Sequence, residues 1–209
     1  MDTKPILTVP KAVIKRLPMY HRFLTQLLQQ GIERISSREL SQLMGITSSQ
    51  LRQDLSYFGE FGQQGYGYRV EILDQAICSI LGLEKNYQAV IVGAGNMGRA
   101  IAGYSGFSRR GLKIVGIFDS NPNLVGNEVG DLSVQDVKFL PGFLAANSIE
   151  IGIITTPASA AQGVADILME HNIKGIWNFA PTALHGNKKV VIEDMHIGDS
   201  LLTLFYKIK

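Results

Sequence analysis

The stretch QAVIVGAGNMGRAIAGYSGFSRRGLKIVGIFDSNP, residues 88–122, decides the fold of this chain. It opens with an apolar run, residues 89–92, that is typical of a buried strand and leads into a G-x-G-x-x-G pattern. The pattern consists of Gly93, Ala94, Gly95, Asn96, Met97 and Gly98. Its first glycine permits a tight turn, its second lets the backbone approach a pyrophosphate, and its third lets the next helix pack on the strand. We expect a helix over residues 96–108 whose N-terminal amides face a diphosphate.

A second apolar run, residues 112–118, ends at Asp119, which follows Gly98 by 21 residues. A carboxylate at this distance can accept hydrogen bonds from the hydroxyls of an adenosine ribose, and it would repel a 2′-phosphate. The residue therefore favours NAD(H) over NADP(H) as the cofactor. A glycine triplet alone also fits an ordinary strand-to-helix corner, but the strand, helix and acid at the correct spacing make the dinucleotide interpretation the stronger one.

Composition and charge set further bounds. With 209 residues and 45% hydrophobic content, the chain can form one large domain or two small ones. Residues 1–70 hold 9 Lys/Arg against 5 Asp/Glu, which permits a polyanionic partner. The single cysteine, Cys78, stands in an apolar context and is expected to be a buried small hydrophobe. The sequence shows no signal core and no run of 18 apolar residues, so we expect a cytoplasmic protein without a membrane partner.

The N-terminal third predicts a helix-turn-helix. From residue 10 to Gly31, apolar residues recur at helical spacing. Two capping-box signatures follow, Ser36 with Glu39 and Thr47 with Gln50, and Gly45 stands between them as a turn residue. Two short helices joined by a tight glycine-containing turn are typical of this motif.

The second of these helices has one apolar and one polar face. On a helical wheel Leu51, Leu55 and Phe58 share one side. The opposite side carries Ser49, Arg52, Gln53 and Ser56. Arg, Gln and Ser suit base edges and phosphates, so we interpret this face as a DNA-reading surface. An ordinary solvated face is the alternative that the helix alone leaves open.

A glycine-rich hairpin is expected after this helix. Residues 58–68, FGEFGQQGYGY, alternate glycines with aromatic residues, as in the wing of a winged helix. A connecting helix over residues 71–83 follows. We therefore expect a winged-helix DNA-binding domain over residues 1–83, a Rossmann-like NAD(H)-binding domain over 84–195, and a C-terminal helix over 196–209.

Strands and helices alternate through the rest of the chain. We expect strands at residues 137–140, 150–155, 175–178 and 189–194, and a helix at 157–172. Such alternation predicts an α/β fold with a doubly wound parallel sheet that binds its ligand at the carboxyl ends of the strands. The candidate residues at those ends are Thr155, Thr156, Pro157, Asn178 and Phe179. Loop capping is the alternative role for each of them.

The last segment, residues 199–209, carries an apolar stripe. Leu201, Leu204, Phe205 and Ile208 recur at helical spacing. The stripe can pack on the sheet of its own chain. It is equally suited to docking on a second subunit, where exchange of the helix would form a dimer.

Taken together, these motifs resemble the Rex family of redox-sensing transcriptional repressors along essentially the whole chain. The resemblance rests on the segments SSQLRQDLSYFGEFGQQGYGY, GAGNMGRA, FD, TTP and KGIWNFAP. It implies a homodimer with exchanged C-terminal helices that binds double-stranded, palindromic operator DNA and leaves it when NADH rises. It also implies that Arg52 lies in the recognition helix, that Phe107 lies near the nicotinamide, and that Asp119 holds the adenosine ribose.

The chain departs from the family pattern at several positions. Gln53 stands where relatives usually carry a basic residue, and so do Gln63 and Gln64 in the wing. We assign Gln53, Gln63, Gln64 and Arg16 to the DNA-binding residues, in addition to those of the polar helix face. Glutamine in place of a basic residue should weaken contacts to DNA phosphates. His196 stands where the family commonly has an aspartate that pairs with Arg16 in the NADH-bound form.

Three other functions are weighed against a repressor. An NAD-dependent oxidoreductase needs an acid or base beside the hydride-accepting carbon and usually a substrate domain, for which the chain leaves no room. An NAD(H) sensor with weakened or lost DNA binding is supported by the glutamines of the wing. A CoA-binding module of similar fold is disfavoured by Asp119.

Overall fold

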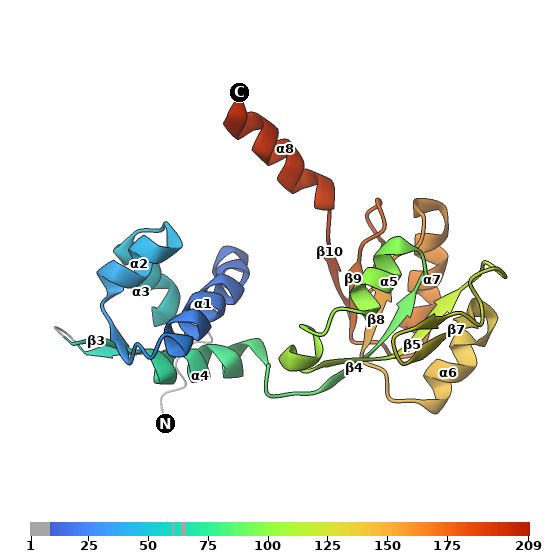
Figure 1. Ribbon diagram of the computed structural model, residues 1–209, viewed down its shortest axis with the longest axis horizontal. Coiled ribbons are helices and arrows are strands. Elements are labelled where there is room, and N and C mark those ends of the chain that lie inside the picture. Colours follow the sequence, from blue (N-terminus) through green and yellow to red (C-terminus); the bar gives the residue numbers. More distant parts are fainter. Residues whose placement is uncertain (1–8, 60, 64–65) are drawn as a thin grey trace. The chain divides into compact units, whose positions relative to one another are not determined.

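The computed structural model describes residues 9–59, 61–63 and 66–209, and the chain divides into two compact units between residues 85 and 86 (Figure 1). Within the described part of the chain, no helix combines the length and hydropathy needed to cross a membrane. Gln64 lies outside the described residues, and of Gln63 only the backbone is described.

The first unit is a set of helices with a small three-stranded sheet. Its helices are α1 (Lys11–Gln29), α2 (Ser37–Met44), α3 (Ser48–Ser56) and α4 (Val70–Leu81), and its strands are β1 (Arg34–Ile35), β2 (Gly62–Gln63) and β3 (Gly67–Arg69). The sheet has the order β1-β3-β2 with antiparallel pairs, so β2 and β3 form the expected hairpin after α3. This arrangement confirms the winged-helix prediction.

Local sequence signals account for the helix-turn-helix. Ser36 and Glu39 form a complete capping box, in which each side chain bonds the backbone N–H of the other residue. Thr47 accepts a hydrogen bond from the N–H of Gln50 and so caps α3. Gly45, with a φ of 68°, ends α2 in the left-handed conformation that glycine adopts most readily. Both ends of α2 and the start of α3 therefore follow from capping residues.

A buried ion pair holds α3 against α1. Asp54 of α3 is fully buried, and Arg16 of α1 donates to its two oxygens at 2.6 and 2.9 Å. Tyr20 and Gln50 donate further hydrogen bonds to the same carboxylate. Burial raises the pKa of Asp54, but the hydrogen bonds from Arg16, Tyr20 and Gln50 outweigh it and hold the pKa below its usual range. The carboxylate therefore stays ionised and fixes α3 on α1.

The second unit is a seven-stranded sheet with helices. Its strands are β4 (Tyr87–Val92), β5 (Leu112–Asp119), β6 (Glu128–Val129), β7 (Leu132–Asp136), β8 (Ile151–Ile154), β9 (Gly175–Asn178) and β10 (Val191–Asp194). The helices are α5 (Asn96–Ala102), α6 (Leu140–Ala146), α7 (Ala158–Glu170) and α8 (Ile197–Ile208), with short 3-10 turns η1 (Ser108–Arg110) and η2 (Val137–Phe139). The strand order is β10-β9-β8-β4-β5-β7-β6, and all pairs are parallel except β6 with β7. This sheet confirms the Rossmann-like prediction.

The two faces of β4 alternate in their packing partners. Val90 and Val92 pack in one core with Leu144 of α6 and Leu168 of α7, whereas Ile91 belongs to the core on the other face. This period of two is that of a strand buried on both faces. By contrast, every residue of α8 is exposed, including its apolar stripe.

Two expected elements were placed wrongly. The strand expected at residues 137–140 is a 3-10 turn leading into α6, because Asp136 accepts a hydrogen bond from the N–H of Lys138 and turns the chain. The strand lies just before it, at β7, paired with β5. The helix expected over residues 96–108 stops at Ala102, since Gly103 ends it and residues 104–110 form turns.

The buried pair gives a first prediction. Asp54→Asn should lower the free energy of unfolding of the first unit by about 3 kcal/mol, because it leaves Arg16 without a counter-charge. A carboxylate with a depressed folded pKa stabilises the protein above its unfolded pKa, about 3.9, and this contribution is lost as pH falls through the folded value. Urea unfolding followed by circular dichroism at pH 7 and in acid measures both effects.

Asp131→Asn, at an exposed turn residue, is the matched control. The single tryptophan, Trp177, lies in β9, so its fluorescence follows the second unit separately. An Asp54→Asn variant as stable as the control at pH 7 would contradict the role of the pair.

Candidate nucleotide pocket and DNA-binding face

The glycine loop between β4 and α5 is shaped by close backbone approaches. A Cβ on Gly98 would collide with the carbonyl oxygen of Gly93, and a Cβ on Gly93 would lie 2.7 Å from the carbonyl of Thr155. Gly93 also has a φ of 109°, where other residues are strained. A Cβ on Gly95 would meet nothing within 4 Å. Gly93 and Gly98 are thus required by the fold itself. Gly95 is not, and the space beside it, at the start of α5, is open.

Asp119 is tied to this loop. Its Oδ2 accepts a hydrogen bond of 2.6 Å from the N–H of Ala94, and its Oδ1 accepts one of 2.8 Å from the N–H of Asn121. The carboxylate stands at the carboxyl end of β5 and remains partly exposed. Since each carboxylate oxygen accepts more than one hydrogen bond, Asp119 can hold the loop and still bind hydroxyl groups.

Thr155 and Thr156 follow the end of β8. The Thr155 hydroxyl donates to the carbonyl of Gly93 at 2.7 Å and so fixes the loop from its other side. The Thr156 hydroxyl is the one buried side-chain N or O atom in the described part of the chain that has no hydrogen-bond partner. Pro157 is exposed and precedes α7. A buried polar group without a partner is costly, and it marks this strand end as a place for a polar ligand.

Asn178 and Phe179, at the end of β9, have different surroundings. The Asn178 side chain is fully buried; its amide donates to Thr182 and Asp194, and its carbonyl accepts from the N–H of Ala180. Both N–H groups of its side-chain amide are therefore bonded within the protein. In this structure Asn178 has the loop-capping role that we gave as the alternative. Phe179 is half-buried and in contact with Trp177.

A row of aromatic rings connects the strand end with residues 104–107. Phe107 packs edge-on against Trp177 at 5.4 Å and against Tyr104 at 4.8 Å between ring centroids, and Trp177 contacts Phe179 at 4.7 Å. Sequence reasoning included Phe107 and Phe179 but missed Trp177. Its signal was its place in β9, two residues before Phe179 and hence on the same face of the strand.

The residues present fit a dinucleotide. The loop supplies open space beside Gly95, Asp119 supplies acceptor oxygens for ribose hydroxyls, and the aromatic row supplies a flat apolar wall for a ring. The phosphates would face the N-terminus of α5, where backbone N–H groups and the helix dipole favour negative charge.

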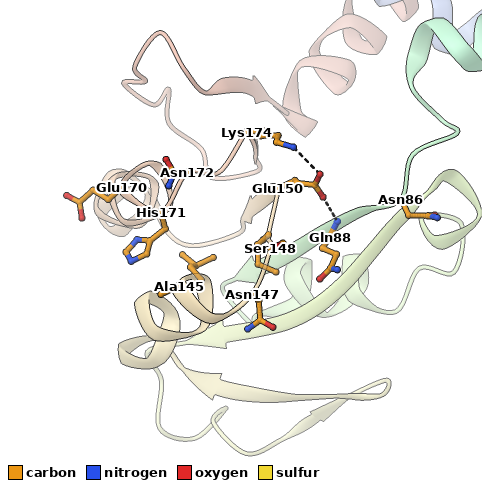
Figure 2. A pocket seen from close by; sticks show the side chains of 12 residues that line it. Asn86, Gln88, Ala145, Asn147, Ser148, Glu150, Glu170, His171, Asn172 and Lys174 are labelled. Atoms are coloured by element: carbon orange, nitrogen blue, oxygen red, sulfur yellow. Dashed lines mark hydrogen bonds and ion pairs between the residues drawn. The ribbon is translucent and has the colours of Figure 1, made fainter.

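Two cavities of the second unit differ in their relation to this site. One, of about 630 Å³, lies at the amino ends of β4, β8 and β9, where Glu150 accepts from the N–H of Gln88 and pairs with Lys174 at 3.2 Å (Figure 2). Because the glycine loop lies at the carboxyl ends of these strands, this cavity is not the nucleotide site. A second cavity, also about 630 Å³, is lined by Tyr104 and Phe107 of the aromatic row.

The polar face of α3 is open, as the helical wheel predicts. Ser49, Arg52, Gln53 and Ser56 are all exposed. The Arg52 guanidinium makes a long contact of 3.3 Å to the Ser37 hydroxyl, and the Ser56 hydroxyl donates to the carbonyl of Gln53. Arg52 and Gln53 thus have side chains free to meet another molecule.

Arg16, which we expect on the DNA side, has a structural partner in this chain. Its guanidinium pairs with the buried Asp54 through two hydrogen bonds and so positions α3. Sequence reasoning missed Asp54 itself. Its signal was a carboxylate three residues after Leu51 on the apolar face of the helix, which requires a buried partner.

Comparison with known proteins supplies the family. Residues 8–56 match the model described as "Putative DNA-binding protein N-terminus", and residues 84–182 match the CoA-binding domain. The chain is 52% identical over 198 residues to the redox-sensing transcriptional repressor Rex of Clostridium perfringens, covering 95% of this chain and 93% of the relative.

Solved structures agree with this relative. The crystal structure of RSP with β-NAD⁺ and operator DNA matches with a TM-score of 0.91 and 51% identity, covering 96% of this chain and 93% of that one. The structure of RSP with β-NADH matches with a TM-score of 0.90 and 48% identity, covering 96% and 94%.

Proposed function

Because this chain belongs to the Rex family of redox-sensing transcriptional repressors, we propose that it binds palindromic operator DNA as a homodimer and leaves it when NADH binds. The chain is a regulator and not an enzyme. The observation that carries the proposal is the match over nearly the whole chain to RSP, which has been crystallised with operator DNA and β-NAD⁺ and separately with β-NADH. Its place of action would be the cytoplasm.

We propose that NADH and NAD⁺ compete for the pocket at the glycine loop. The diphosphate would lie against residues 93–98, the adenosine ribose on Asp119, and the nicotinamide toward Phe107 and Phe179. Thr155, Thr156 and Pro157 would form the wall at the end of β8. The open space at Gly95 and the orphaned hydroxyl of Thr156 support this placement.

The DNA contacts would come from α3 and the wing. Arg52 suits bidentate contact with guanine, Gln53 suits adenine, and Ser49 and Ser56 suit either base edges or phosphates. A two-fold dimer presents two such helices, which is why the operator is expected to be palindromic. The exposure of Ser49, Arg52, Gln53 and Ser56 supports the assignment.

Exchange of α8 between subunits would form the dimer. The exposed fraction is 49 to 71% in the single chain for the four residues of the apolar stripe, Leu201, Leu204, Phe205 and Ile208. Such an apolar helix is costly to leave in water, and a second subunit would cover it.

A sensor that has lost DNA binding is the second candidate. The observation that favours it is the glutamine at positions 53, 63 and 64, where the family usually carries basic residues. Selection of duplex DNA from a random pool, followed by titration of the selected sequence with NADH and with NAD⁺, separates the two. A palindrome released preferentially by NADH supports the repressor, whereas NADH binding without any enriched sequence supports the sensor.

Arg52→Ala should abolish specific operator binding and leave NADH binding unchanged. The loss of a bidentate contact should cost about 1–3 kcal/mol at each half-site. Fluorescence anisotropy with operator DNA and quenching of Trp177 emission by NADH measure the two activities. An unchanged operator affinity would remove Arg52 from the reading surface.

Asp119→Ala should weaken NADH binding and reduce the preference for NADH over NADPH, because the repulsion of a 2′-phosphate is lost. Titration calorimetry with both dinucleotides measures this. Since Asp119 also holds the N–H of Ala94, Asp119→Asn is the better matched variant, retaining an acceptor oxygen without the charge. A retained preference in both variants would refute the ribose assignment.

Gln53→Lys should strengthen DNA binding and steepen its salt dependence by about one unit of log affinity per log salt, the change expected for one added phosphate contact. The affinity for operator DNA should be measured over a series of salt concentrations. Ser148→Lys adds the same charge at an exposed residue of the second unit and serves as the control. Equal slopes for the Gln53 and Ser148 variants would place residue 53 away from the phosphates.

A further inference from the structure

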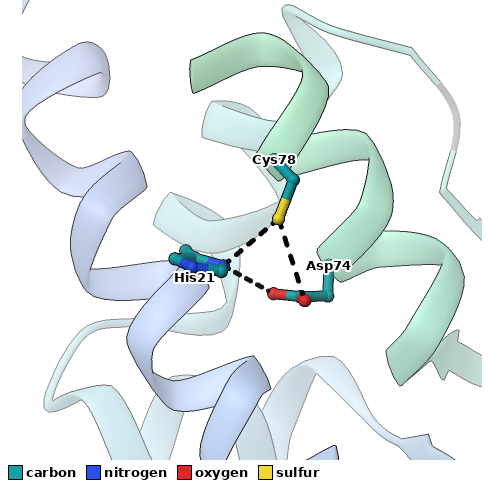
Figure 3. A group of neighbouring side chains, drawn as sticks. All are labelled: His21, Asp74 and Cys78. Carbon is teal, nitrogen blue, oxygen red and sulfur yellow. Dashed lines mark hydrogen bonds and ion pairs between the residues drawn. The ribbon is translucent and has the colours of Figure 1, made fainter. Parts of the chain in front are cut away.

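Three metal-ligating side chains converge between α1 and α4 of the first unit. His21 of α1 lies with its Nδ1 2.8 Å from Oδ1 of Asp74, and the Sγ of Cys78 lies 3.5 Å from the same nitrogen (Figure 3). Asp74 and Cys78 are one helical turn apart on α4, so both point toward α1. This is the one group of three or more such residues in the described part of the chain that could hold an ion.

The arrangement differs from a catalytic relay. In a relay of cysteine, histidine and aspartate, the nucleophile and the acid meet opposite nitrogens of the imidazole ring. Here the thiol and the carboxylate both approach Nδ1 of His21. Three donor atoms gathered around one position suit the coordination of an ion. They do not form the linear series of hydrogen bonds that proton transfer needs.

We infer that His21, Asp74 and Cys78 form a binding site for a divalent transition-metal ion of the Zn²⁺ type. Imidazole nitrogen, thiolate and carboxylate are the three ligand types that Zn²⁺ takes in proteins. With its usual bond lengths, a tetrahedral zinc ion separates its ligand atoms by about 3.4–3.6 Å. The Sγ–Nδ1 distance is 3.5 Å and the Sγ–Oδ2 distance of Asp74 is 3.9 Å, whereas the hydrogen-bonded Nδ1 and Oδ1 lie 2.8 Å apart. Binding of the ion would replace this hydrogen bond, and side-chain rotations that move Nδ1 and Oδ1 apart would complete the site.

The site has room for a fourth ligand and for entry of the ion. All three residues are half-buried, and the His21 side chain is 24% exposed. Water can therefore reach the open position. The Thr25 hydroxyl of α1, 3.5 Å from Nδ1 of His21, is a protein oxygen that could take it.

Metal binding here would link the first and last helices of the DNA-binding unit. His21 and Asp74 are 53 residues apart in sequence, and α1 packs against α4. A bond across such a span restricts the unfolded chain and adds ligand-binding free energy to the folded state. His21 is also next to Tyr20, which bonds Asp54, so the ion would stiffen α1 where it holds α3.

Titration of the chelator-treated full-length protein with Co²⁺ tests the site. Cys78 is the only cysteine, so a thiolate-to-cobalt charge-transfer band can arise from this residue alone. We expect one Co²⁺ per chain, intense tetrahedral d–d bands and displacement by Zn²⁺. Zn²⁺ should also raise the thermal unfolding temperature of the wild-type protein.

Variants separate this site from other modes of binding. Cys78→Ser should abolish the charge-transfer band and the thermal shift, and His21→Gln and Asp74→Asn should each weaken Co²⁺ binding by roughly tenfold or more. His185→Gln, at an exposed histidine in the second unit, should bind as the wild type does. Absence of the band in the wild-type protein, a stoichiometry of one ion per two chains, or unchanged affinity in both the His21 and Asp74 variants would overturn the proposal.

Discussion

The second unit depends on the contact between Gly98 and the carbonyl of Gly93. With no side chain at either residue, α5 begins directly against the end of β4, and Thr155 closes the same corner from β8 through its hydrogen bond to Gly93. Asp119 holds the loop from β5. The parallel strands β4, β5 and β8 thus all hold this one loop at their carboxyl ends. The loop that the fold needs for packing leads directly into the N-terminus of α5, whose N–H groups would face the diphosphate of a bound dinucleotide.

In the first unit, too, one contact determines how the helices pack. Asp54 is an ionised group in the core of a DNA-binding domain, and it is retained there by Arg16, Tyr20 and Gln50. Buried pairs of this kind add little net stability over a hydrophobic core, but they allow one arrangement of the helices and penalise others. The pair therefore fixes the rotation of α3. That rotation decides which side chains, Arg52 and Gln53 among them, face away from the core.

Much of this architecture was predictable because its signals are local. The glycine pattern with Asp119, the capping residues Ser36 and Thr47, and the polar face of α3 each lie within a short stretch whose spacing determines the geometry. The errors came from competition between neighbouring elements: the apolar residues 137–140 begin a helix because Asp136 turns the chain before them. The side-chain groups that were missed join distant segments. Asp74 and Cys78 are one turn apart and visible as a pair, but their approach to His21 depends on the register in which α1 packs on α4.

The departures from the family pattern would affect two different quantities, the DNA affinity itself and the change in that affinity when NADH binds. If residue 53 faces a phosphate as proposed, the missing basic residue would lower DNA affinity in every ligand state, because such a contact does not depend on which nucleotide is bound. The ratio between the states is set elsewhere, since a ligand shifts an equilibrium only by its difference in affinity for the two forms. His196 would belong to this second class, since the resemblance implies an acid at that position that pairs with Arg16. In this chain Arg16 has a carboxylate partner in Asp54 within the first unit, so that pair does not depend on the residue at position 196.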